Sequence, residues 1–136
     1  MKTIHRSYNK AAGDFNLLCH FMIQESKTLR ALSTWCLVRF VDWKWGLYDN
    51  VLAVPDFWER NAQLWFDGFG DLAGLAISET GSGDFAILTT EGYRFLFGEM
   101  LAWVLETWGS ERSPLSIEIT ERATAEASAL ERAGFE

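Results

Sequence analysis

The chain has 136 residues, enough for one domain with a buried core, and 49% of them are hydrophobic. Its formal net charge is -7, and no run of lysines or arginines is interleaved with aromatic residues, so nucleic acid is not an expected partner. The N-terminus lacks the apolar core of a signal peptide, and no apolar stretch reaches the roughly 20 residues of a membrane span. We expect a single cytoplasmic domain, residues 1–136, that does not enter a membrane.

The aromatic content is high for this size, with seven Trp and ten Phe. An aromatic-rich core is the first interpretation, and an aromatic-lined pocket or apolar interface is the second. Cys19 and Cys36 fall within apolar helical patterns and are expected to be reduced and buried. Together with His5 and His20 they show no metal-ligand spacing, so no metal is expected.

The first half of the chain predicts a strand followed by two helices. Polar and apolar residues alternate over 3–8, as in a strand. A helical stripe then follows, with Asp14 near its start; its members are Phe15, Leu18, Cys19, Met22 and Ile23. A second helix is predicted over 28–41 and is apolar nearly all round, so it should be buried on more than one side. A loop or broken helix is expected over 49–60, around Pro55.

The second half predicts strands at 63–66 and 72–79 around a glycine-rich turn, and a third strand at 84–89. A long helix over 91–108 leads to a strand at 115–119, which should pair in parallel with 84–89. The last helix is predicted to begin at Thr120 and to end at Gly134, in the left-handed conformation. The order β-α-α-β-β-β-α-β-α indicates an α+β domain with a mixed, mostly antiparallel sheet flanked by helices.

The junction between the strand at 84–89 and the next helix is the most informative feature. Where a strand runs into a helix, backbone N–H groups and the helix dipole point at one spot that suits an anion such as a phosphate. Arg94 lies in this junction.

This order of elements resembles the GNAT superfamily of acetyl-CoA-dependent N-acetyltransferases. The resemblance is carried by 4–8, 64–76, 85–89, Tyr93-Arg94 and 130–135, which ends in Gly-Phe. It implies an acyl-CoA N-acyltransferase-like fold, acetyl-CoA as co-substrate, and acetyl transfer to a small or unknown amine. It also implies that the pantetheine arm bonds to the strand backbone at Ile87, Leu88 and Thr89. The pyrophosphate would then rest on Arg94, Phe95, Leu96, Phe97 and Gly98.

Two features depart from the pattern of this family. Arg94 occupies the first position of the phosphate loop, but Phe97 and Glu99 replace its two glycines. A Phe Cβ hinders close backbone approach, and a carboxylate opposes phosphate binding. The family also continues with two strands after its Gly-Phe. The sequence therefore suggests a truncated domain, the first half of a tandem protein, or a sheet completed by a second domain or in a homodimer.

Acetyl transfer to an amine requires a proton acceptor. Glu118, on the polar face of the strand at 115–119, is the candidate general base, with a solvent-facing strand residue as the alternative; Glu79 is the weaker candidate. The resemblance places Trp35, Trp43 and Trp45 in the acceptor region, where they either line a pocket or pack helices on the sheet.

Three functions remain open at this point. The first is an amine acetyltransferase, and the second is a non-catalytic GNAT-like structural or interaction domain. The third is a binding protein whose tryptophans hold an apolar ligand.

Overall fold

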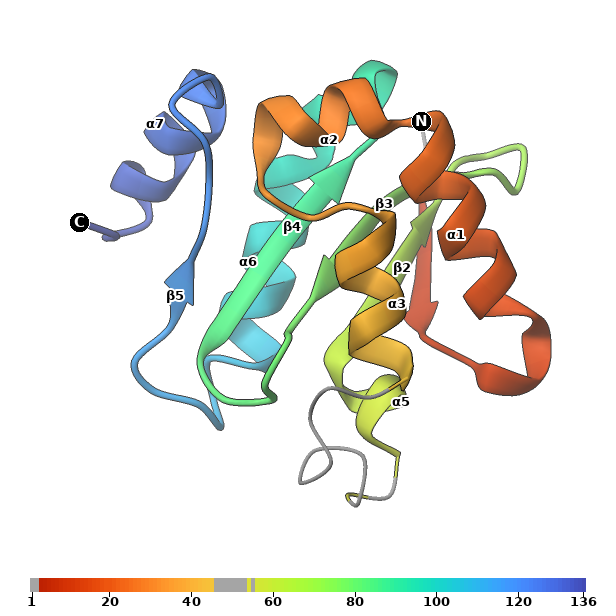
Figure 1. Ribbon diagram of the computed structural model, residues 1–136. Helices are drawn as coiled ribbons and strands as arrows, with labels where there is room; N and C mark the ends of the chain where they lie inside the picture. The colour runs from red at the N-terminus through yellow and green to blue at the C-terminus, as the bar shows by residue number, and fades with distance from the viewer. Residues whose placement is uncertain (1–2, 46–53, 55) are drawn as a thin grey trace.

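The computed structural model describes residues 3–45, 54 and 56–136, and these form a sheet between two layers of helices (Figure 1). The strands lie side by side in chain order: β1 (Ile4–Ser7), β2 (Ala62–Phe66), β3 (Leu72–Ile77), β4 (Asp84–Thr89) and β5 (Ser116–Ile117). Neighbouring strands are antiparallel except β4 and β5, which are parallel. The predicted α+β fold with a mixed, mostly antiparallel sheet is confirmed.

Helices cover both faces of the sheet. In Figure 1, α1 (Asp14–Gln24), α2 (Ser26–Leu32) and α3 (Leu37–Trp45) lie in front, after a short 3-10 turn η1 (Lys10–Ala12). The short α5 (Phe57–Asn61) leads into β2. Behind the sheet lies α6 (Phe97–Thr107), preceded by the 3-10 helix η2 (Glu91–Leu96), and α7 (Thr124–Arg132) follows β5.

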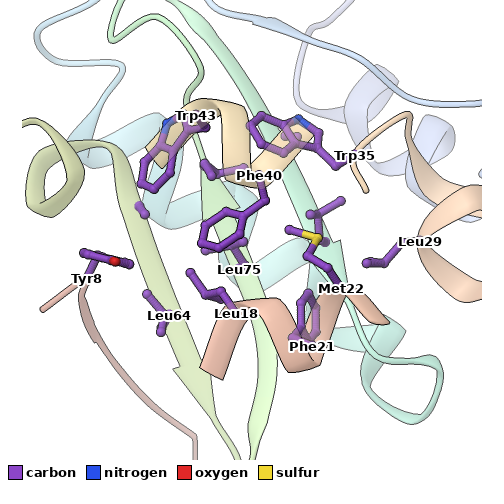
Figure 2. Close-up of a cluster of buried hydrophobic side chains, with 14 of the residues drawn as sticks. Tyr8, Leu18, Phe21, Met22, Leu29, Trp35, Phe40, Trp43, Leu64 and Leu75 are labelled. Atoms are coloured by element: carbon purple, nitrogen blue, oxygen red, sulfur yellow. The ribbon is translucent and has the colours of Figure 1, made fainter. Parts of the chain in front are cut away.

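The core under α1, α2 and α3 is rich in aromatic side chains, in agreement with the composition (Figure 2). Phe40 stacks on Trp43 with 5.6 Å between ring centroids, and Tyr8 meets Trp43 edge-on at 5.9 Å. The Trp43 indole N–H donates to the Ser78 carbonyl at 2.9 Å, so the tryptophan also joins α3 to the end of β3. Aliphatic side chains complete this layer; Figure 2 labels Leu18, Met22, Leu29, Leu64 and Leu75.

The helix predicted over 28–41 is broken in the structure. α2 ends at Leu32 and α3 begins at Leu37, because Ser33 is extended (φ -158°) and its hydroxyl accepts the N–H of Trp35 at 3.1 Å. Serine side chains that bond to nearby backbone compete with the helix in this way. The break turns Trp35 into the core and leaves Cys36 exposed.

Some predictions of burial are therefore wrong. Cys36 is exposed and Cys19 is only partly buried, although both are free thiols, as expected. In α1, Ile23 is 56% exposed and Phe21 is buried in its place, so the buried stripe is narrower than the pattern indicates.

The elements after β4 also differ from their predicted bounds. The helix predicted over 91–108 consists of η2 and then α6, and the strand predicted over 115–119 has only two paired residues. Thr120 does not begin the last helix: its N–H donates to the Leu32 carbonyl at 3.0 Å and its hydroxyl donates to the Ala31 carbonyl. The predicted end is correct, since Gly134 has a φ of 97°.

The loop or broken helix predicted over 49–60 lies partly outside the described residues, at 49–53 and 55. The remainder includes α5.

Candidate functional site

The parallel pairing of β4 with β5 is short and depends on a glycine. The Ser116 N–H donates to the Gly83 carbonyl at 2.8 Å, and the registered pairs stop at Phe85 and Ile117. A Cβ on Gly83 would lie 1.8 Å from the carbonyl oxygen of Pro114. Glycine is therefore required at position 83 for β5 to approach β4 at all.

Beyond this point the outer edge of β4 carries peptide groups without a strand partner. The Thr90 N–H donates to the Ala73 carbonyl at 3.0 Å, so by strand alternation the peptide groups of Leu88 face β3. Those of Ile87 and Thr89 face away from β3, on the side of β5. No backbone group of the described residues bonds to them there, although both residues are buried. Buried peptide groups need partners, so this edge offers donors and acceptors to a ligand.

Glu118 lies one residue beyond β5, where the chain has left β4. It accepts hydrogen bonds from Arg39 Nη1 at 2.9 Å and from the Thr34 hydroxyl. Arg39 Nε also donates to Glu79 at 2.8 Å, and its guanidinium stacks over the Trp35 ring at 4.3 Å. The two sequence-predicted carboxylates, Glu118 and Glu79, thus meet through one arginine that sequence reasoning missed.

A cavity of about 250 Å³ lies between α3, the end of β3 and the start of β5, and its lining includes Trp35, Arg39, Glu79 and Glu118. The hydrogen bonds from Thr34 and from Arg39 hold the pKa of Glu118 below its usual value, against the opposing effect of burial. Glu118 is therefore ionised at neutral pH. Two carboxylates beside an indole ring form a site that suits a cation, and Arg39 occupies that position in this structure.

The three predicted acceptor tryptophans are not brought together. Trp35 lines the cavity with Glu118. Trp43 lies in the core, and Trp45 is 66% exposed beside Phe15 and Lys44.

The predicted phosphate loop, 94–98, lies inside a helical segment. η2 begins at Glu91, and the Phe97 N–H donates to the Arg94 carbonyl, so the start of α6 is already bonded within the helix. Leu96 and Phe97 are buried against the sheet, whereas Phe95 is exposed. The space around the Cα of Gly98 is open. Glu99, the expected repulsive charge, accepts a hydrogen bond from Thr3 at 2.8 Å beside β1, at the other edge of the sheet.

Arg94 is engaged by acidic residues. Its Nη2 lies 2.9 Å from Glu126 Oε1 and its Nε lies 3.2 Å from Glu126 Oε2, a two-point ion pair with a carboxylate that is 3% exposed. Glu91 adds a second carboxylate at 3.9 Å. No sequence signal links Arg94 to Glu126, because the two residues are far apart in the chain.

A larger cavity, about 710 Å³, lies on the α6 and α7 side of β5. Leu105, Leu130 and Phe135 are among the apolar side chains that line it. The converging carboxylates and arginine lie instead at the smaller cavity, which we therefore take as the candidate site.

Within the described residues, no group of three or more His, Cys, Asp or Glu could hold a metal ion. In the same part of the chain, no helix is long and apolar enough to span a membrane.

Comparison with known proteins gives a structural likeness and no sequence match. No family model matches the chain, and no curated protein matches it significantly. The crystal structure of the ribosomal-protein-S18-alanine N-acetyltransferase from Escherichia coli matches with a TM-score of 0.62 and 16% sequence identity. The match covers 99% of this chain and 78% of the bacterial chain. At this identity the likeness shows the fold, and the chain has the GNAT fold of N-acetyltransferases.

Proposed function

We propose that this domain is a GNAT-type N-acetyltransferase that moves an acetyl group from acetyl-CoA to a primary amine. The proposal is carried by the outward peptide groups of Ile87 and Thr89, which no backbone group in the described part of the chain binds. They lie on β4, whose neighbour β5 leads to Glu118. The GNAT fold supports it independently.

The donor would bind as an added strand along the outer edge of β4. Ile87 and Thr89 are two residues apart, so their outward peptide groups repeat about every 6.6–6.8 Å. The two amides of a pantetheine arm can pair with such an edge as an extended peptide does. Leu88 would contribute only its side chain, because its peptide groups face β3, and 94–98 would lie toward the phosphate end. When bound, the donor supplies an acetyl thioester.

Glu118 would act as the proton acceptor. Glu118, whose pKa Thr34 and Arg39 lower and which is ionised at neutral pH, first takes one proton from the cationic amine and so frees the nitrogen lone pair. The neutral amine then attacks the thioester carbonyl, the C–N bond forms, the C–S bond breaks, and the leaving thiolate takes up the second proton that the nitrogen loses. Before the first proton transfer, the cationic amine would take the position of the Arg39 guanidinium between Glu79 and Glu118.

The acceptor would contact Trp35 rather than all three predicted tryptophans. Trp43 would support the site from the core, and the exposed Trp45 would lie outside it. The E. coli protein of the same fold acts on a protein alanine. Peptide α-amines therefore belong in the acceptor panel beside small amines. A cytoplasmic location is consistent with the free thiols Cys19 and Cys36.

Thiol release from acetyl-CoA, measured over a panel of primary amines and peptides, tests this function. For any accepted amine, Glu118→Gln should lower kcat by about 10²–10⁴. Glu121→Gln, the same change at an exposed residue three positions on, should leave kcat unchanged. Equal activity of the two variants would exclude Glu118 as the base.

A non-catalytic GNAT-like domain is the second candidate, favoured by the occupied Arg94. Such a domain would serve as a structural module, with a homodimer or a second domain completing the sheet beyond β5. Sedimentation over a range of concentrations tests it: self-association without donor binding would support a module. A monomer that binds acetyl-CoA would count against one.

A further inference from the structure

In the part of the chain that the structure describes, the junction between β4 and α6 offers no free cation to a phosphate. Arg94 is the arginine of the junction, and two carboxylates neutralise its charge. Glu126 binds the guanidinium at two points, and Glu91 lies 3.9 Å away. A phosphate that binds this guanidinium must compete with a carboxylate that is 3% exposed and pairs with it at two points.

The Phe97 N–H at the start of α6 is not free to bind an anion. A helix start binds phosphate through N–H groups that have no partner within the helix. Here η2 runs directly into α6, and the Phe97 N–H donates to the Arg94 carbonyl. The earlier Glu91 N–H points at the side chain of Glu25, 3.4 Å from Oε1. The junction is therefore lined by carboxylates where a phosphate would have to approach.

The contrast with the β4 edge is the basis of the inference. The outward peptide groups of Ile87 and Thr89 are neutral and have no backbone partner among the residues that the structure describes, so they suit the amides of a pantetheine arm. We infer that the donor site recognises the acyl-pantetheine part of a thioester and gains nothing from a nucleotide diphosphate. The donor class is then acyl-pantetheine thioesters in general, with acetyl-CoA as one member. This inference rests on the proposed function.

Calorimetry with acetyl-CoA, S-acetylpantetheine and adenosine 3′,5′-diphosphate tests it. The dissociation constants of the two thioesters should lie within about tenfold of each other. The nucleotide alone should give no heat at millimolar concentration. A larger preference for acetyl-CoA, or binding of the nucleotide alone, overturns the inference while leaving the proposed function intact. Binding of neither thioester overturns the proposed function and this inference with it.

Glu126→Gln gives the second arm, because it removes the charge that neutralises Arg94. It should tighten acetyl-CoA binding about fivefold to tenfold, leave S-acetylpantetheine unchanged and make acetyl-CoA binding weaken with added salt. The double variant Arg94→Ala with Glu126→Gln should lose the gain. Glu99→Gln is the matched control, since it removes the same charge from the first turn of α6, at a side chain that bonds to Thr3 at the other edge of the sheet.

Circular dichroism checks that Glu126→Gln folds. If it does not, Glu91→Gln, at a side chain that is 69% exposed, should change acetyl-CoA affinity in the same direction by less. An equal gain for both thioesters, or no gain for either, contradicts the inference.

Discussion

The guanidinium of Arg94 and the buried carboxylate of Glu126 form a two-point ion pair that joins η2 to α7. The pair ties the segment that follows β4 to the segment that follows β5. Two further contacts also hold the chain that follows β5. Arg39 donates to Glu118, and the Thr120 N–H donates to the Leu32 carbonyl at the end of α2. Three contacts thus join the chain beyond β5 to the rest of the domain, around the outer edge of β4.

Loss of Arg94 should destabilise the fold. Arg94→Ala leaves the Glu126 carboxylate buried without its cation, which costs about 3 kcal/mol in the free energy of unfolding. Urea denaturation measures this cost. Replacing both partners by apolar residues, Arg94→Met with Glu126→Leu, should return the stability to within about 1 kcal/mol of the parent chain. A fully stable Arg94→Ala would mean that the pair contributes no net stability.

Arg39 and Thr34 should set the pH dependence of the proposed activity. Both lower the pKa of Glu118, so the ionised carboxylate persists to lower pH than usual. Thr34→Val or Arg39→Ala should raise that pKa and move the acidic limb of the kcat/KM profile to higher pH. A carboxyl ¹³C titration of Glu118 gives the same readout without activity. Unchanged titration in both variants would contradict the assigned cause.

Gly83 should be intolerant of a side chain. Gly83→Ala would place a Cβ 1.8 Å from the Pro114 carbonyl oxygen, so β5 must move away from β4 at a cost of about 2 kcal/mol or more. Hydrogen exchange at Ser116, whose N–H bonds to Gly83, reports the loss directly. Gly68→Ala is the control, because nothing lies within 4 Å of its Cβ, and it should change stability by less than about 0.5 kcal/mol. Retained protection of Ser116 in Gly83→Ala would contradict the close approach.

Asp14 should contribute stability that is lost in acid. Burial acts to raise its pKa, but the hydrogen bonds from Arg6 and the Asn9 N–H outweigh it and the net pKa is lowered. The contribution is therefore complete above the unfolded-state value of about 3.9 and disappears as the pH falls through the lower folded value.

Asp14→Asn should cost about 2 kcal/mol at neutral pH and flatten the loss of stability below about pH 4. Glu106→Gln, at an exposed carboxylate, is the control for the change in charge. Parallel pH profiles of Asp14→Asn and the parent chain would show that the Asp14 ion pair does not act as described.

The strand order could be predicted from the sequence because it depends on local patterns. The hairpin of β2 and β3 follows from alternation around a glycine-rich turn, and the end of α7 follows from Gly134. The break between α2 and α3 could not be predicted in the same way. It depends on the Ser33 hydroxyl and on burial of Trp35, whereas the apolar pattern runs on through both.

The candidate site was harder to predict than the fold. Glu118 could be named from strand alternation and Glu79 from its place at the end of a predicted strand, but their shared partner Arg39 lies in a helix distant in the chain. Arg94 could be placed at the junction after β4, yet it forms an ion pair with Glu126, and no spacing rule connects the two residues. Long-range ion pairs of this kind depend on tertiary packing, and a single sequence carries no record of them.

The measurement closest to the proposed chemistry is an amide ¹H–¹⁵N titration with S-acetylpantetheine. We expect the N–H signals of Ile87 and Thr89 to move together and saturably, as hydrogen bonds to the pantetheine amides form, while that of Leu88, which is bonded toward β3, moves little. Saturable binding with shifts confined to residues away from β4, or no binding at millimolar ligand, would contradict a donor site on this strand.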